Sequence, residues 1–182
     1  YYLASMAELD RAGYSSELYW SRIFVDRHLF ENIAKLRSFR RLSQAFFTVL
    51  GKEQRHIPLL ALSSERMMTR YDAEVNLLRT TISSIASIWG MADEIHCLPY
   101  DYLTGEASER AKRMARNIPI VLCEESHLDK VQDPLAGSYF VENLTEELSE
   151  KAWELFVNIE KQGGFTPYIE SGAMQQELAH SL

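Results

Sequence analysis

The sequence predicts an α/β fold made of four βα units in series, and two observations carry this prediction. Four short apolar runs, rich in β-branched and aromatic residues, start about 40 residues apart along the chain. Each run is followed by a longer segment in which apolar residues recur every three or four positions, the spacing of one helix face. Consecutive strand–helix units of this kind place their strands parallel, with right-handed crossovers.

The predicted elements follow one another in a regular order. Residues 4–13 are typical of the end of a helix that stops at Gly13. The four predicted strands come after it, at residues 19–25, 57–62, 94–100 and 138–142. Each is a short apolar run rich in β-branched and aromatic residues, which is typical of a strand.

The first two strands are followed by the most regular helical patterns. The apolar stripe after the first strand consists of Leu29, Ile33, Leu36, Phe39, Leu42 and Phe46. The basic residues between them, which we expect to form a solvated helix face, are Lys35, Arg37, Arg40 and Arg41. The stripe after the second strand consists of Val75, Leu78, Ile82, Ile85 and Trp89. Gly90 is expected to end this second helix with a positive φ angle.

Two further helices are predicted after the third and fourth strands. The third pattern runs from Ala111 to Leu122 but contains Pro119, which predicts a kink or break just before that proline. The fourth apolar stripe consists of Leu148, Ala152, Leu155 and Ile159. Asn143, with Glu146 three residues on, is the expected N-cap of the fourth helix, and Gly163–Gly164 is expected to end it.

Composition and charge limit the class of protein. The 182 residues are 46% hydrophobic and fit a single domain, and the net charge of −7 argues against nucleic acid or an anionic membrane as a partner. No apolar run approaches the ~20 residues that span a bilayer. Cys97 and Cys123 suggest two reduced thiols in a cytoplasmic protein. Because the chain starts at Tyr1 rather than Met, we expect a fragment of a longer protein.

The pattern of elements leaves two architectures open. Parallel βα units build either an open doubly wound sheet or a (β/α)8 barrel. The doubly wound alternative would gain from a phosphate-binding loop of the form G-x-G-x-x-G or G-x-x-x-x-G-K, and the sequence contains neither.

The expected carboxyl ends of the strands are the place to look for chemistry, because functional side chains of barrels gather there. Asp26 and Asp101 are candidate acids or bases at these ends. A lone carboxylate after a strand more often caps the next helix, so we predict no catalytic role for either.

Metal and nucleophile patterns are equally sparse. The only groupings are His96 beside Cys97, and Cys123 four residues before His127, and neither supplies the three or four ligands of a zinc site. Ser63–Ser64 lacks the G-x-S-x-G setting of an activated serine. The residues taken alone therefore predict no metal site and identify no reaction.

Several strings nevertheless resemble one family, in unbroken order over about residues 18–172. They are Ile33-Ala34-Lys35-Leu36-Arg37, Tyr71-Asp72, Asn76-Leu77-Leu78-Arg79-Thr80-Thr81, Ala115-Arg116-Asn117, Glu124-Glu125-Ser126, Asp133-Pro134, Gly137-Ser138-Tyr139 and Lys151-Ala152-Trp153-Glu154. The chain thereby resembles the adenosylcobalamin-dependent acyl-CoA mutases, above all methylmalonyl-CoA mutase, which interconverts methylmalonyl-CoA and succinyl-CoA.

The resemblance implies a particular fold and domain. The family folds its acyl-CoA-binding part as a (β/α)8 TIM barrel, so residues 1–182 would be a partial acyl-CoA mutase barrel domain, its C-terminal half, with four βα units. The resemblance places the family's active-site histidine upstream of Tyr1. The D-x-H-x-x-G motif of the separate cobalamin domain is missing, since Asp26-Arg27-His28 is followed by Glu31 where glycine is needed.

The departures from the family concern its ligand-binding positions. A glutamine and an asparagine–glutamate pair that face the cofactor and its ribose in catalytic subunits align with Leu62, Leu98 and Tyr102. An arginine and a serine that hold CoA align with Leu18 and Trp20. These positions are therefore expected to be degenerate, and we expect this chain to bind neither cofactor nor substrate. Loss of several polar contacts would abolish productive binding, because each unpaired buried group costs ~1–3 kcal/mol.

The resemblance thus implies the non-catalytic small (beta) subunit, which pairs with a catalytic large subunit in a cytoplasmic heterodimer. The alternative is a fragment of a catalytically active, divergent adenosylcobalamin-dependent mutase. A third hypothesis is an unrelated α/β binding domain. An isolated half-barrel is also expected to self-associate, because it exposes open strand edges and an uncovered apolar layer.

Overall fold

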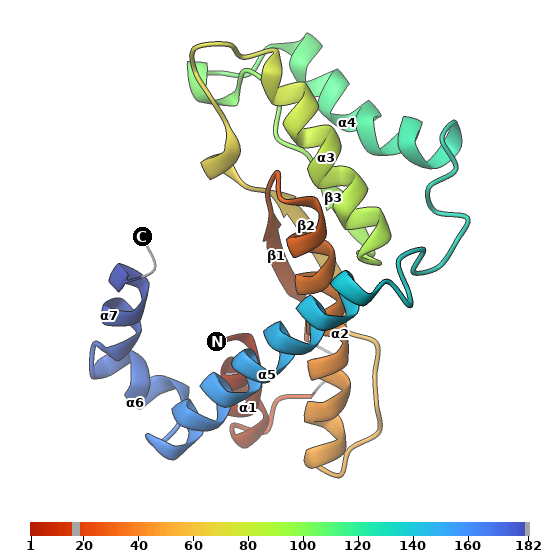
Figure 1. Ribbon diagram of the computed structural model, residues 1–182. Coiled ribbons are helices and arrows are strands. Elements are labelled where there is room, and N and C mark those ends of the chain that lie inside the picture. The colour runs from red at the N-terminus through yellow and green to blue at the C-terminus, as the bar shows by residue number, and fades with distance from the viewer. Residues whose placement is uncertain (16–18, 181–182) are drawn as a thin grey trace.

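A computed structural model of the chain describes residues 1–15 and 19–180, and it contains a three-stranded parallel sheet (Figure 1). The strands are β1 (Ser21–Val25), β2 (Leu59–Ser63) and β3 (Glu94–His96), in that order across the sheet. The helices are α1 (Tyr2–Arg11), α2 (Leu29–Val49), α3 (Val75–Trp89), α4 (Glu109–Glu124), α5 (Tyr139–Lys161), α6 (Phe165–Glu170) and α7 (Ala173–His180). Short 3-10 turns η2 (Glu65–Met67) and η3 (Tyr102–Thr104) follow β2 and β3. No helix among the described residues is long and apolar enough to cross a membrane.

The predicted fold class is confirmed: the chain is α/β with parallel strands, as expected for part of a (β/α)8 barrel. Three βα units are present, β1–α2, β2–α3 and β3–α4, and α2 and α3 pack side by side. The helix that ends before Gly13 and the end of α5 before Gly163–Gly164 are also confirmed.

The fourth predicted strand is wrong, because residues 139–142 form the first turn of α5. Val141 is 0% exposed there, packed in a buried cluster with Ile33 and Ala86. This packing continues at four-residue spacing through Thr145 and Ser149, so the buried contact with α2 overrides the local β propensity. The N-cap is accordingly Ser138 and not Asn143.

Two predicted details of helix ends and interiors are also corrected. Gly90 does end α3, but its φ is −81° and the positive φ falls on Met91. Glycine is needed at position 90 for space, since a Cβ there would lie 2.5 Å from Cδ1 of Leu36 on α2. Of the kink or break predicted just before Pro119, the break is wrong, because α4 continues through the proline.

Three of the four basic residues of α2 are partly buried, contrary to the predicted solvated face: they are Lys35, Arg37 and Arg40, whereas Arg41 is exposed. Arg37 forms ion pairs with Glu142 at 2.7 Å and Asp133 at 3.2 Å, both from the segment that leads into and begins α5. Further along α2, Arg41 pairs with Glu146 of α5. The prediction fails because α5 lies along α2, an arrangement made by residues about a hundred positions away (Figure 1).

The other two basic residues of α2 bind the sheet. Arg40 donates to the carbonyl of Ile57 at 2.5 Å and to Oδ2 of Asp93 at 2.6 Å, so it ties together the amino ends of β2 and β3. Lys35 donates to the carbonyl of Phe24 at 2.6 Å, on the edge of β1 that faces away from β2. This bond satisfies one of the main-chain groups that an edge strand leaves unpaired.

The two faces of the sheet differ sharply in burial. Leu59 and Ala61 are fully buried towards the helices, within the core that also contains Val25 and Leu36. The alternate residues point to the other face, where Phe24 is 61% exposed. This second face, called the open face below, consists of Trp20, Arg22, Phe24, Leu60, Leu62, Glu94 and His96.

Gly90→Ala should destabilise the chain by about 1–3 kcal/mol, because the added methyl overlaps the Leu36 side chain. Chemical denaturation measures the loss. A Leu36→Ala background removes the closest atom, Cδ1, but leaves Cβ of residue 36 and the carbonyl of Ala86 each 2.8 Å from the added methyl. In that background the same substitution should cost less, by on the order of 1 kcal/mol, as expected for contacting residues. An equal loss in both backgrounds would contradict the steric explanation.

The open face should make the isolated chain self-associate, since exposed apolar strand residues seek cover from water. Sedimentation velocity should detect dimers or larger species. Phe24→Ser should shift the population towards monomer, whereas the control Leu78→Ser, at a residue 69% exposed on α3, should not. A monomer at high concentration for the unmodified chain would count against this expectation.

Candidate functional site

The carboxyl ends of β1, β2 and β3 lie at one edge of the sheet and form the candidate site. Asp26 follows β1, Ser64 follows β2, and Asp101 lies in the loop after β3. The structure shows what each of these side chains does.

Asp26 holds the turn that leads into α2. Its Oδ1 accepts hydrogen bonds from the backbone N–H of His28 at 2.8 Å and from the Asn32 side chain at 2.7 Å. Burial raises the pKa of the Asp26 carboxyl, but these hydrogen bonds and the charge of Lys35 outweigh it, so the pKa is lowered. The carboxylate is thus ionised and structural, although it does not cap the helix as predicted.

Asp101 plays a similar role at the start of α4. Its Oδ2 accepts from the backbone N–H of Ser108 at 3.0 Å, and Ser108 in turn caps α4 by accepting from Ala111 at 3.2 Å. Burial raises the pKa of Asp101, and the hydrogen bonds from Ser108 more than offset this and lower it. Asp101 therefore positions the N-cap residue and does not cap α4 itself.

The predicted metal groupings are not brought together. His96 lies on the open face, whereas the thiol of Cys97 is buried at 3.0 Å from Oγ of Ser84, and burial raises its pKa. His127 follows the end of α4 with a positive φ, outside the helix that holds Cys123. Among the described residues no three potential ligands lie close enough to hold a metal ion.

The described positions among those expected to be degenerate lie at or near the open face and the loops above it. Leu62 lies between Phe24 and His96 in the register of the sheet, and Trp20 stacks with the guanidinium of Arg22 at 5.3 Å. Leu98 is partly buried just after β3. Leu18 lies outside the described residues.

Tyr102 is the only polar residue at the described positions that are expected to correspond to cofactor ligands, and its hydroxyl donates to Oε1 of Glu65 at 2.8 Å. Leu62 and Leu98 have no side-chain donor or acceptor. A ribose needs such partners for its hydroxyl groups, because burying them unpaired is costly. These residues therefore do not fit an adenosyl group.

Asn76 is a positioning residue that the sequence analysis did not single out. It is fully buried at the start of α3 and links two loops above the sheet. Its side chain accepts from the N–H of Thr69 at 2.9 Å and donates to the carbonyls of Thr69 at 2.9 Å and Tyr100 at 2.8 Å. The sequence feature that could have identified Asn76 is a polar residue at the start of an apolar helical stripe.

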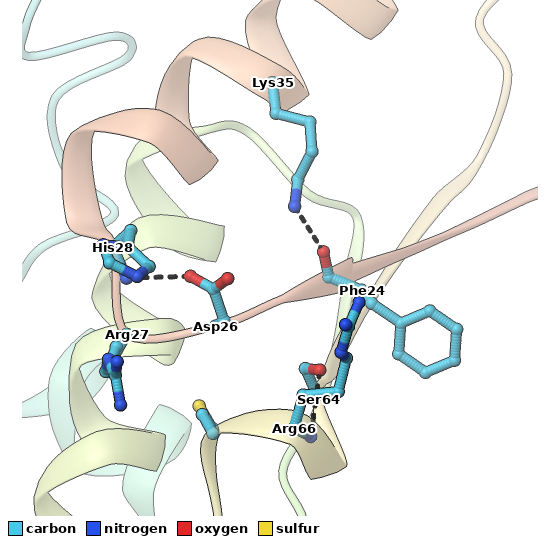
Figure 2. A pocket seen from close by; sticks show the side chains of 8 residues that line it. Phe24, Asp26, Arg27, His28, Lys35, Ser64 and Arg66 are labelled. Carbon is cyan, nitrogen blue, oxygen red and sulfur yellow. Dashed lines mark hydrogen bonds between the residues drawn. The ribbon is translucent and has the colours of Figure 1, made fainter. Parts of the chain in front are cut away.

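A pocket of about 380 Å³ at the ends of β1 and β2 was also missed by the sequence analysis (Figure 2). Its lining residues are Phe24, Asp26, Arg27, His28, Lys35, Ser64, Arg66 and Met67. Cationic residues directly after two predicted strand ends were the signal that could have pointed to it.

The parallel βα units, with loops linked above the carboxyl edge of the sheet, are consistent with a segment of a (β/α) barrel domain. A family model described as methylmalonyl-CoA mutase matches residues 20–182. The chain belongs to the methylmalonyl-CoA mutase family.

Three relatives illustrate the similarity. The methylmalonyl-CoA mutase small subunit of Streptomyces virginiae is 41% identical over 82% of this chain, and that of Porphyromonas gingivalis is 38% identical over 94%. The 2-hydroxyisobutanoyl-CoA mutase large subunit of Aquincola tertiaricarbonis is 32% identical over 82%. The matched regions cover 24%, 29% and 27% of these proteins, so the chain spans about a quarter of their length.

Asn76→Ala should destabilise the chain by about 1–3 kcal/mol, because it leaves partly buried main-chain groups of Thr69 and Tyr100 without their side-chain partner. Hydrogen exchange should show faster exchange in both loops, 64–74 and 97–104. The control Asn117→Ala, on the exposed surface of α4, should change stability by less than about 0.5 kcal/mol. Faster exchange in only one loop would contradict the linking role.

Proposed function

We propose that this chain is part of the non-catalytic small subunit of a methylmalonyl-CoA mutase. In this proposal it forms part of a barrel that docks on and stabilises a catalytic large subunit, which interconverts methylmalonyl-CoA and succinyl-CoA. The observation that carries the proposal is the apolar character of Leu62 and Leu98 at the carboxyl edge of the sheet, where the family's catalytic subunits are expected to present polar groups.

The residues that match the family give the proposal a second line of support, because their contacts stabilise the fold. Arg37 and Asp133, from two of the matching strings, form an ion pair between α2 and the segment before α5. Asn76, from a third string, links the loops after β2 and β3. A chain that retains its scaffold residues and lacks polar ligand groups suits a supporting subunit.

The cofactor, substrate and cellular setting follow from the same proposal. Adenosylcobalamin and the acyl-CoA would be bound by the large subunit, in a cytoplasmic heterodimer of propionate metabolism, and this chain would hold neither. Residues 1–182 would be one partial barrel domain without a cobalamin-binding domain. The names of the Streptomyces and Porphyromonas relatives support the small-subunit role.

The alternative is a fragment of an active, divergent acyl-CoA mutase. One observation favours it: the Aquincola relative is a large subunit. Its identity to this chain, 32%, is lower than the 41% and 38% of the two small subunits, so we place this alternative second.

Neither adenosylcobalamin nor an acyl-CoA should bind tightly to this chain or to the longer protein that contains it. Isothermal titration calorimetry at micromolar ligand should show no saturable binding, where a Kd of ~1 μM corresponds to about −8.2 kcal/mol. A catalytic mutase that binds both ligands is the positive control.

Restoring one polar residue at a time should not rescue binding, because the ligand-binding side chains of the protein act as a unit. Leu62→Gln and Tyr102→Glu should therefore titrate like the unmodified protein. Saturable micromolar binding of either ligand by the unmodified longer protein would overturn the non-catalytic assignment and favour the active mutase.

A further inference from the structure

The pocket at the ends of β1 and β2 has an excess of positive charge, although the whole chain carries −7. Arg27, Lys35 and Arg66 contribute three cations to its lining, and Asp26 contributes its only carboxylate. Figure 2 shows Lys35 and Arg66 reaching the space from α2 and η2, with Asp26 between the strand end and the helix. The lining is thus left with a net positive charge of about two, which attracts anions.

The two arginines are not used by the fold. Within the described parts of the chain, the side chains of Arg27 and Arg66 form no hydrogen bond or ion pair and are exposed to solvent. The arginines of α2 behave differently, since Arg37 and Arg40 are each bound to a carboxylate. An arginine with all its donors free beside a pocket is available to a ligand.

Further donors line the same space. Lys35 uses one of its three N–H groups on the carbonyl of Phe24, which leaves two. The hydroxyl oxygen of Ser64 accepts from the N–H of Arg66 at 3.3 Å, so its own hydrogen remains available. The 21-residue helix α2 starts at Leu29, directly beside the pocket, and its amino end adds partial positive charge.

The carboxylate of Asp26 does not neutralise the cations that line the pocket. Its Oδ1 is held by His28 and Asn32, and it carries a single negative charge. Burial lowers the pKa of Lys35, and the nearby charges of Asp26 and Glu31 oppose this without restoring it. An anion in the pocket would therefore stabilise the lysine in its charged form.

We propose that this pocket binds the phosphate group of a small molecule, held by Arg27, Arg66, Lys35 and Ser64. Phosphate suits the site better than a carboxylate because it carries up to two charges and offers oxygens in several directions to separate cations. The volume of about 380 Å³ exceeds that of a phosphate group and lies at the small end of ligand sites, so an organic part can be accommodated. The inference does not depend on the small-subunit assignment.

The test is a titration of the chain with inorganic phosphate and, separately, with AMP, followed by amide chemical shifts in NMR at constant ionic strength. Shifts should centre on residues 26–30 and 64–67 and saturate in about the millimolar range, far weaker than the micromolar binding of a catalytic mutase's ligands that we expect to be absent. Both probes binding supports phosphate recognition, and tighter binding of AMP adds that the organic part is also held. Acetate should cause weaker, non-saturating shifts.

Arg27→Ala and Arg66→Ala should each weaken phosphate binding about tenfold, the effect of losing ~1.4 kcal/mol. Arg113→Ala, which removes an exposed arginine of α4 away from the pocket, should change it less than twofold. Since these side chains are exposed, the variants should keep the thermal stability of the unmodified chain. Absence of saturation with both phosphate probes, equal binding of acetate, or equal weakening by Arg113→Ala would overturn the proposal.

Discussion

A parallel sheet has to cover both of its faces, and the described helices of this chain cover one. Helices α2 and α3 bury Leu59 and Ala61 on that side, while Phe24 on the open face is largely exposed. In a closed barrel the second face is covered by the strands opposite, so this arrangement suits a barrel segment whose remaining strands lie elsewhere. A second constraint acts at the edge of the sheet, where main-chain groups lack a strand partner. The bond from Lys35 to the outer edge of β1 satisfies a carbonyl that a neighbouring strand would otherwise pair.

The residues that match the mutase family gain a physical explanation from the structure. They fix α5 along α2 through Arg37, and they hold the loops at the carboxyl edge through Asn76. None of these contacts requires a ligand, so they can persist in a chain that has lost catalytic groups. The proposed supporting subunit and the proposed phosphate pocket both use this scaffold, but they depend on different side chains.

Local patterns predicted much of the fold, because strand length and helical periodicity are properties of neighbouring residues. They failed where distant residues decide: the sequence around Val141 favours a strand, but its burial against Ile33 makes it the first turn of α5. The partners of Arg37 lie about a hundred residues away, so its role was invisible in the local pattern. At the candidate site, the apolar residues at expected ligand positions were predicted from the family resemblance and not from local patterns. The pocket could not be predicted locally, because Arg27 and Arg66 line it from the segments that follow two different strands.

The most direct test of the barrel account is hydrogen exchange at the outer edge of β1. Ser21 and Val25 bond towards β2, so the N–H groups of Arg22 and Phe24 point away from it. Both amides should exchange rapidly in the isolated chain under dilute, monomeric conditions. Exchange should be at least ~100-fold slower in the longer protein of our proposal, in which a preceding strand would pair with β1. Equally rapid exchange in the two proteins would contradict the claim that this sheet is a segment of a closed barrel.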